Sequence, residues 1–89
     1  MTIEKIEGFI KDHINQSHYI DVHIKGRTVE PVMFIAATDY EELKEKNFWR
    51  VVTASKAALW QKTKDQKLVR IYSGNLFTRL TASMNTQLQ

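Results

Sequence analysis

The stretch from Lys67 to Leu80 constrains the fold of this chain more than any other. It is typical of two short strands, because β-branched and aromatic residues run up to a tight turn at Ser73-Gly74-Asn75 and resume after it. A sharp fold at a glycine late in an 89-residue chain is how a small barrel closes on itself and removes its unpaired edges. We therefore expect the upstream segments to pack against this strand pair.

Hydrophobic spacing divides the upstream chain into one helix and several strands. Isoleucines three and four residues apart, from Ile3 to Ile14, predict an amphipathic helix over residues 2–16 that covers one open end of a sheet. From Tyr19 the pattern changes to alternation, which predicts a strand with one buried face. We expect strands at 19–25, 28–37, 48–54, 67–72 and 76–80, with one or two helical turns within 38–47.

The segment Ser55–Lys62 is ambiguous. Its alanines and leucine allow a helix, whereas its length and the turn that follows favour a hairpin into the next strand. We expect a strand. The chain then forms a single α+β domain over residues 1–89. A helix at 2–16 packs on a strongly bent five- or six-stranded antiparallel barrel over 19–80, and a flexible tail follows at 81–89.

Composition excludes several classes of protein. The chain has no cysteine, which removes disulfides, thiolate nucleophiles and the commoner zinc sites. No apolar run approaches the about 20 residues of a membrane span. The first residues lack the basic flank and apolar centre of a signal peptide. We expect a cytoplasmic protein with no membrane partner.

Charge is distributed unevenly along the chain. Residues 1–43 hold four Lys or Arg against eight Asp or Glu, whereas residues 44–89 hold nine against two. The first half therefore carries −4 and the second half +7. This asymmetry favours an anionic partner for the second half. The alternatives are ordinary solubility charge, or attraction between the two halves within one molecule or across a dimer.

No pattern of residues indicates catalysis or a metal centre. His13, His18 and His23 fall on a predicted helix end, a loop and a strand face, so their convergence on a metal would be a coincidence. The carboxylates that begin at Asp39 have no histidine at ligand spacing beside them. No set of nucleophile, base and orienting group is recognisable from spacing. We expect a non-enzymatic protein with no catalytic residues, no metal and no cofactor.

The layout resembles SH3-like small barrels, and in particular those of the Sm-like kind. The segment Tyr72–Leu80 resembles the second Sm motif, in which Gly and Asn precede the closing strand, and Asn75 falls within it. The chain also resembles WYL domains, which are themselves Sm-like. The segments that carry this second resemblance are Arg27–Pro31, Phe48–Val52, and Arg70–Tyr72 together with Arg79-Leu80. The resemblance spans about residues 19–80 and implies an SH3/Sm-like fold.

Basic and aromatic residues of the second half form the candidate binding surface. Barrel surfaces bind single-stranded nucleic acid by stacking bases on aromatic rings while cations meet phosphates. Two alternatives stay open. The rings lie in the core. Arg50 and Arg70 either pair with Asp21 or Glu30 across strands, or are exposed with their aliphatic stems packed against the sheet. The candidate ligand-binding residues are Arg50, Trp60, Lys62, Arg70, Asn75 and Arg79.

These features predict a small binding module for nucleic acid or a nucleotide-like anion. The alternative is an oligomerisation or protein-docking module within a larger assembly. In that case the acidic first half of one molecule meets the basic second half of its neighbour. The expected partners are therefore nucleic acid or an anionic nucleotide, a second copy of the chain, or another protein.

Overall fold

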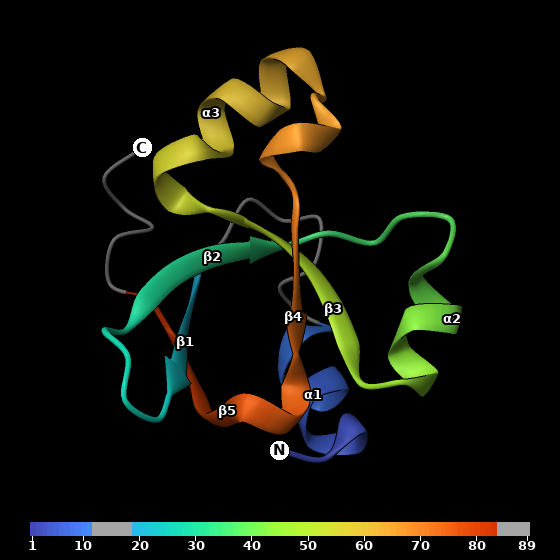
Figure 1. Cartoon of the computed structure of the whole chain (residues 1–89), viewed down its shortest axis with the longest axis vertical. Coiled ribbons are helices and arrows are strands. Elements are labelled where there is room, and N and C mark those ends of the chain that lie inside the picture. The colour runs from blue at the N-terminus through green and yellow to red at the C-terminus, as the bar shows by residue number, and fades with distance from the viewer. Residues whose placement is uncertain (12–18, 84–89) are drawn as a thin grey trace.

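The computed structural model describes residues 1–11 and 19–83, and the chain is α+β as expected. An N-terminal helix precedes a five-stranded antiparallel sheet (Figure 1). The helices are α1 (Ile3–Ile10), α2 (Tyr40–Glu45) and α3 (Ala54–Thr63), with single 3₁₀ turns η1 (Gln66–Leu68) and η2 (Gly74–Leu76). The strands are β1 (Ile20–Ile24), β2 (Glu30–Phe34), β3 (Phe48–Thr53), β4 (Arg70–Ser73) and β5 (Phe77–Ala82).

The sheet is curled rather than flat. Its order, β4-β3-β2-β1-β5, places two strands that are consecutive in the chain at opposite edges. The backbone from Ser73, the end of β4, to Phe77, the start of β5, spans at most about 14 Å. In a flat five-stranded sheet the edge strands would lie about 19 Å apart. The predicted break at the glycine is confirmed, because β4 ends at Ser73 and η2 begins at Gly74. The sheet is nevertheless open, since β4 and β5 are its two edge strands and do not pair with each other.

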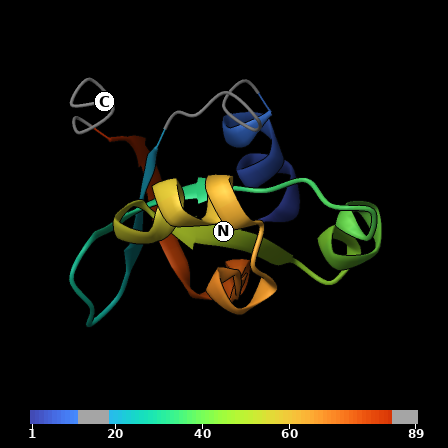
Figure 2. The ribbon, with the colours of Figure 1, turned by 90° about the horizontal axis from the view of Figure 1, so that it is seen from above.

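Strand β3 contributes side chains to two cores on opposite faces of the sheet. Trp49 and Val51 belong to the main core, together with Ile6 and Ile10 of α1. Val52 belongs to a second core, where α3 packs. Alternate residues of a strand point to opposite faces, so one strand holds both helices in place. Helices α1 and α3 accordingly lie well apart around the sheet (Figure 1, Figure 2).

Helix α1 begins where the sequence predicts. Thr2 is the N-cap, and its side chain accepts a hydrogen bond from the Lys5 backbone N–H at 3.3 Å. Ile6 and Ile10 are fully buried, one turn apart on the face that meets the sheet. The helix ends at Ile10, and the part of the predicted helix over 12–16 lies outside the described residues.

The prediction of a strand at Ser55–Lys62 is wrong, because this segment lies within helix α3. Alanine and leucine are strong helix formers, and their preference outweighs the length argument for a hairpin. Lys64 ends the helix in the left-handed conformation, with φ of 55°. Ala57 is fully buried against the sheet, and its small side chain lets the helix backbone approach the second core. The sheet therefore has five strands, and the sixth does not form.

Strand β5 extends two residues beyond the predicted end at Leu80 and pairs with β1 as far as Ala82. Ser83 is buried, and its backbone N–H donates to the Tyr19 carbonyl at 3.0 Å. Residues 81–83 are thus held by the sheet, although the sequence predicts a flexible tail from 81. Residues 84–89 lie outside the described part of the chain.

A buried asparagine joins the η2 corner to β3 and to the N-terminus. Asn47 has a left-handed φ of 62° and is 6% exposed. Its Oδ1 accepts from Trp49 Nε1 at 2.8 Å, and its Nδ2 donates to Met1 O at 3.1 Å and to Asn75 Oδ1 at 3.2 Å. Its carbonyl accepts from the Gly74 backbone N–H at 2.7 Å. One side chain therefore fixes where the corner sits.

Candidate functional site

The six predicted site residues come from different elements of the fold. They are distributed over five elements: Arg50 on β3, Trp60 and Lys62 on α3, Arg70 on β4, Asn75 in η2 and Arg79 on β5. Strands β4 and β5 are the opposite edges of the sheet, so Arg70 and Arg79 belong to different edges. Lys62, Arg70 and Arg79 are exposed, whereas Arg50 and Trp60 are half-buried.

Arg50 is engaged within the fold. Its Nε and Nη2 donate to Asp39 Oδ1 and Oδ2 at 3.1 and 2.6 Å. The hydrogen bond from Arg50 holds the pKa of Asp39 below its ordinary value, and the same bond raises the pKa of Arg50. Of the alternatives left open for Arg50, pairing with a carboxylate is the one that holds, but the partner is Asp39 and neither Asp21 nor Glu30. The carboxylate comes instead from the residue before α2, which no strand register could indicate.

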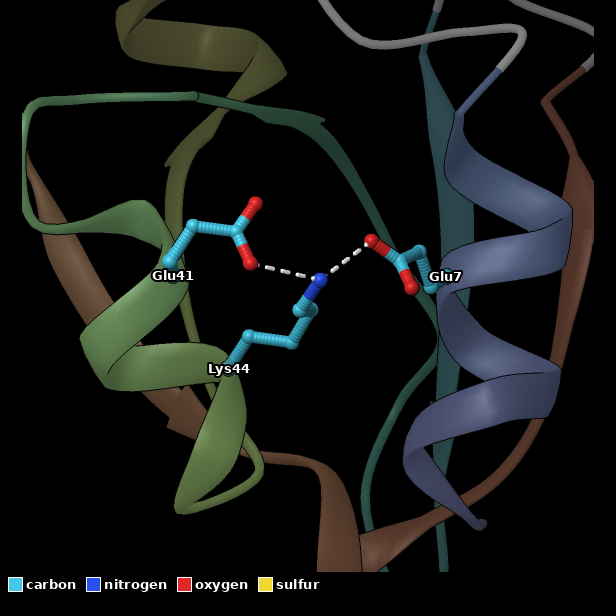
Figure 3. Close-up of polar contacts among 3 residues, drawn as sticks. All are labelled: Glu7, Glu41 and Lys44. Atoms are coloured by element: carbon cyan, nitrogen blue, oxygen red, sulfur yellow. Dashed lines mark hydrogen bonds and ion pairs between the residues drawn. The ribbon is translucent and has the colours of Figure 1, made fainter.

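Lys44 is a second cation that the fold neutralises (Figure 3). Its Nζ lies 2.7 Å from Glu7 Oε2 of α1 and 2.8 Å from Glu41 Oε1 of its own helix. Hydrogen bonds to Glu41 and Glu7 raise the pKa of Lys44 above its ordinary value. The ammonium also lies 5.6 Å from the centre of the Tyr40 ring. These contacts tie α2 to α1 and leave little charge for a ligand.

Asn75 has a structural partner as well. Its Oδ1 accepts from Asn47, and its backbone N–H donates to Ser73 Oγ at 3.3 Å. The Ser73 side chain thereby caps η2. Asn75 is exposed, but these contacts account for its presence at the corner without a ligand.

The remaining cations of the second half concentrate on one segment, which we call the basic segment. It runs from α3 through η1 to the start of β4, over residues 56–70. Its cations are Lys56, Lys62, Lys64, Lys67 and Arg70, and all five are exposed. None of them forms an ion pair with a carboxylate in the described part of the chain. Asp65 is the single acid of the segment, and its side chain accepts from the Lys67 backbone N–H.

Trp60 contributes more to the second core than to the surface. The ring is half-buried beside that core, and Lys64 Nζ lies over it at 4.0 Å from the ring centroid. Its indole N–H is buried and has no hydrogen-bond partner among the described residues. Of the two roles considered for the aromatic rings, a place in the core describes Trp60 better than a place on a binding surface. Trp49 is 2% exposed and lies entirely in the core.

A pocket that the sequence did not reveal lies between β4 and the turn after β1. It has a volume of about 230 Å³ and is lined by Ile24, Arg27, Ile71, Tyr72, Ser73 and Leu76. The sequence signal that could have indicated it is the pair of apolar residues flanking the corner. Ile71 is 50% exposed and Leu76 is 58% exposed, whereas Gly74 between them is buried.

The described residues contain neither a cluster of metal-ligating side chains nor a membrane-spanning helix. Over residues 1–11 and 19–83, no three His, Cys, Asp or Glu side chains come together in a group able to hold a metal ion. His13 and His18 lie outside those residues, and the ring of His23 is hydrogen-bonded to Thr81 Oγ1 at 3.0 Å. No helix in the same ranges combines the length and apolar character needed to cross a bilayer.

The fold and this surface together define a small α+β protein with a basic helical segment inserted between two paired strands of an antiparallel sheet. Comparison of the sequence with known protein families, with curated proteins and with solved structures finds no match.

Proposed function

We propose that the chain binds single-stranded nucleic acid, or another polyanion of similar charge spacing, through the basic segment. The observation that carries this proposal is the five exposed cations within residues 56–70, none of which is paired with a described carboxylate. By contrast, Lys44 and Arg50 have carboxylate partners. Cations that the fold neutralises add little to the external field, whereas unpaired cations attract phosphates.

We also propose that the fold is a small barrel of the SH3/Sm-like kind. The curled sheet of order β4-β3-β2-β1-β5, with a single 3₁₀ turn between β4 and β5, supports this assignment. In such barrels the connection between neighbouring strands is free to carry a ligand-binding insertion. Here that connection is the one from β3 to β4, which contains α3 and η1.

Fluorescence anisotropy with a labelled single-stranded oligonucleotide, titrated with the full chain at several salt concentrations, tests the proposal. If three to four phosphates are neutralised, the slope of log K against log salt should be about −2 to −3. The triple variant K62A/K64A/K67A should bind more weakly and with a shallower slope. Absence of binding at low salt would overturn the proposal.

A matched triple variant separates local charge from net charge. K5A/K11A/K46A removes the same three charges from exposed positions outside the basic segment. This control should bind the oligonucleotide nearly as tightly as the wild type. If both triple variants lose affinity equally, the net charge of the chain is responsible and the basic segment is not a site.

Protein docking is the second candidate, and the free edge of the sheet favours it. Strand β4 is an edge strand, and the exposed apolar residues Phe48, Ile71 and Leu76 lie on it or near it. An exposed edge of this kind can pair with a strand from another chain. We propose self-association through this edge as the alternative function. Sedimentation velocity over a wide concentration range tests it, and a monomer throughout would exclude self-association.

A further inference from the structure

The pocket beside β4 combines apolar walls with a polar strand edge. Ile24, Ile71 and Leu76 supply the apolar surface, and Arg27 reaches the pocket from the turn that Gly26 makes with φ of 80°. Its volume of about 230 Å³ is below the range of about 300–1,000 Å³ that holds a drug-sized molecule. A single planar ring system suits this volume better than a larger ligand.

On the edge away from β3, the backbone of β4 offers hydrogen-bonding groups that no strand of the described residues pairs. The Gly74 N–H donates to Asn47 O, and β4 pairs with β3 in the same antiparallel ladder. In such a ladder alternate residues bond to the neighbouring strand. Arg70 and Tyr72 therefore bond toward β3, whereas Ile71 and Ser73 direct their N–H and C=O groups to the free edge. Ile71 and Ser73 both line the pocket. Their backbone N–H and C=O groups can therefore form hydrogen bonds with polar atoms at the edge of a planar ligand.

The Tyr72 wall of the pocket is held rigidly. The Tyr72 hydroxyl donates to Glu30 Oε1 at 2.6 Å, and the ring meets Phe77 edge-on with a centroid distance of 6.4 Å. Burial, together with the bond to Glu30, raises the pKa of Tyr72 to about 12, so the phenol stays neutral at physiological pH. Because the Tyr72 side chain is already ordered, binding does not incur the entropic cost of immobilising it.

Two arginines place positive charge at the same pocket. Arg27 lines it directly, and Arg70 lies two residues before Tyr72 on β4. Residues two apart on a strand point to the same face, so Arg70 lies on the same face of β4 as Tyr72, which lines the pocket. Neither forms an ion pair with a described carboxylate. Arg70 is also the last cation of the basic segment, so the charged track leads to the pocket.

We propose that this pocket holds one unstacked base of a single-stranded nucleic acid, with Arg27 and Arg70 contacting the adjacent phosphates. The inference rests on the proposed function and adds to it the position at which a base is recognised. Apolar walls take the faces of the base, and the free edge of β4 takes its polar rim. The two arginines beside the pocket favour a ligand that carries phosphates. A neutral apolar side chain from a protein partner would leave both arginines without an anionic partner.

The test compares two probes of equal length, a single-stranded oligonucleotide and an abasic deoxyribose-phosphate chain, by competition for the full-length protein. One base held in a pocket should make the first probe bind about 5- to 150-fold more tightly than the second. Leu76→Ser should close this gap. Val29→Ser is the matched control, because Val29 is 39% exposed, lies outside the basic segment and does not line the pocket. Arg27→Ala should reduce the salt slope by about 1.

The outcomes separate this inference from the proposed function. Equal binding of both probes, with strong salt dependence, would overturn the pocket and leave the basic segment in place. Binding of neither probe would overturn both, and would direct attention to an apolar side chain of a protein partner as the occupant. A gap that persists in L76S, or closes equally in V29S, would also overturn the assignment of the base to this pocket.

Discussion

Replacing Gly74 by alanine tests whether the η2 corner is as tightly filled as the structure indicates. A Cβ at this position would overlap Asn47 Oδ1 and would lie 2.5 Å from Ile6 Cδ1 and 2.8 Å from Asn47 Cγ. Neither neighbour can give way easily. The Asn47 side chain holds hydrogen bonds to Trp49, Met1 and Asn75, and Ile6 is fully buried.

The expected magnitude follows from these contacts. Overpacking costs about 1–3 kcal/mol. If the Asn47 amide moves, the buried Trp49 N–H loses its acceptor at a cost of about 1–3 kcal/mol more. Reduced freedom of the unfolded chain offsets about 0.4–1 kcal/mol. We expect Gly74→Ala to lower the free energy of unfolding by about 2–4 kcal/mol, a large share of the about 5–15 kcal/mol typical of a domain.

Urea unfolding followed by tryptophan fluorescence measures this loss, which should lower the midpoint by about 2 M if m is about 1.5 kcal/mol/M. Gly8→Ala is the control. A Cβ at Gly8 meets nothing within 4 Å on an exposed position of α1, so alanine should stabilise the protein by about 0.5–1 kcal/mol. Surface substitutions usually change the free energy of unfolding by no more than about 0.5 kcal/mol. If G74A lowers it by no more than this, the corner is not tightly filled and the reasoning is refuted.

Two further substitutions test the polar contacts through their pH dependence. Asp39→Asn should destabilise the protein near neutral pH. Arg50 lowers the pKa of Asp39 from its ordinary 3.8, so the contribution of the pair is present above that value and is lost as pH falls through the lowered pKa. Unfolding curves should therefore converge with the wild type in acid, and a constant gap would contradict the assignment. Tyr72→Phe should cost about 1 kcal/mol through loss of the bond to Glu30. The raised pKa of about 12 means that this contribution is present below pH 10.0 and lost as pH rises through 12. Absorbance titration should show a phenol that ionises near pH 12 in the wild type and not in Y72F.

The parts of the fold that follow from local spacing could be predicted from the sequence. The isoleucine period predicted the start of α1, the alternation after Tyr19 predicted β1, and the glycine predicted the break between β4 and β5. Each of these signals depends on residues close in the chain. The segment Ser55–Lys62 was mispredicted because its helix preference is local, whereas the argument for a strand relied on connection length.

The site was harder to predict because it depends on contacts between distant segments. Arg50 and Arg70 look alike in sequence, each flanked by apolar residues, yet only Arg50 meets a carboxylate in the described structure. The difference lies in the path of the loop before α2, which brings Asp39 to β3. The pocket likewise joins the turn after β1 to the corner after β4, about 45 residues later in the chain. No spacing rule connects such segments.

The placement of α3 separates what anchors this helix from what it displays. It replaces the loop of an antiparallel hairpin, since β3 and β4 pair on either side of it. Ala57 seats it above Met33 and Val52, and removing it would uncover both of those side chains. Lys56 and Lys62 of the same helix are exposed and do not belong to that core. Inverting the charge of either lysine should therefore change the charge that the helix presents to a ligand while the strands beneath keep their register.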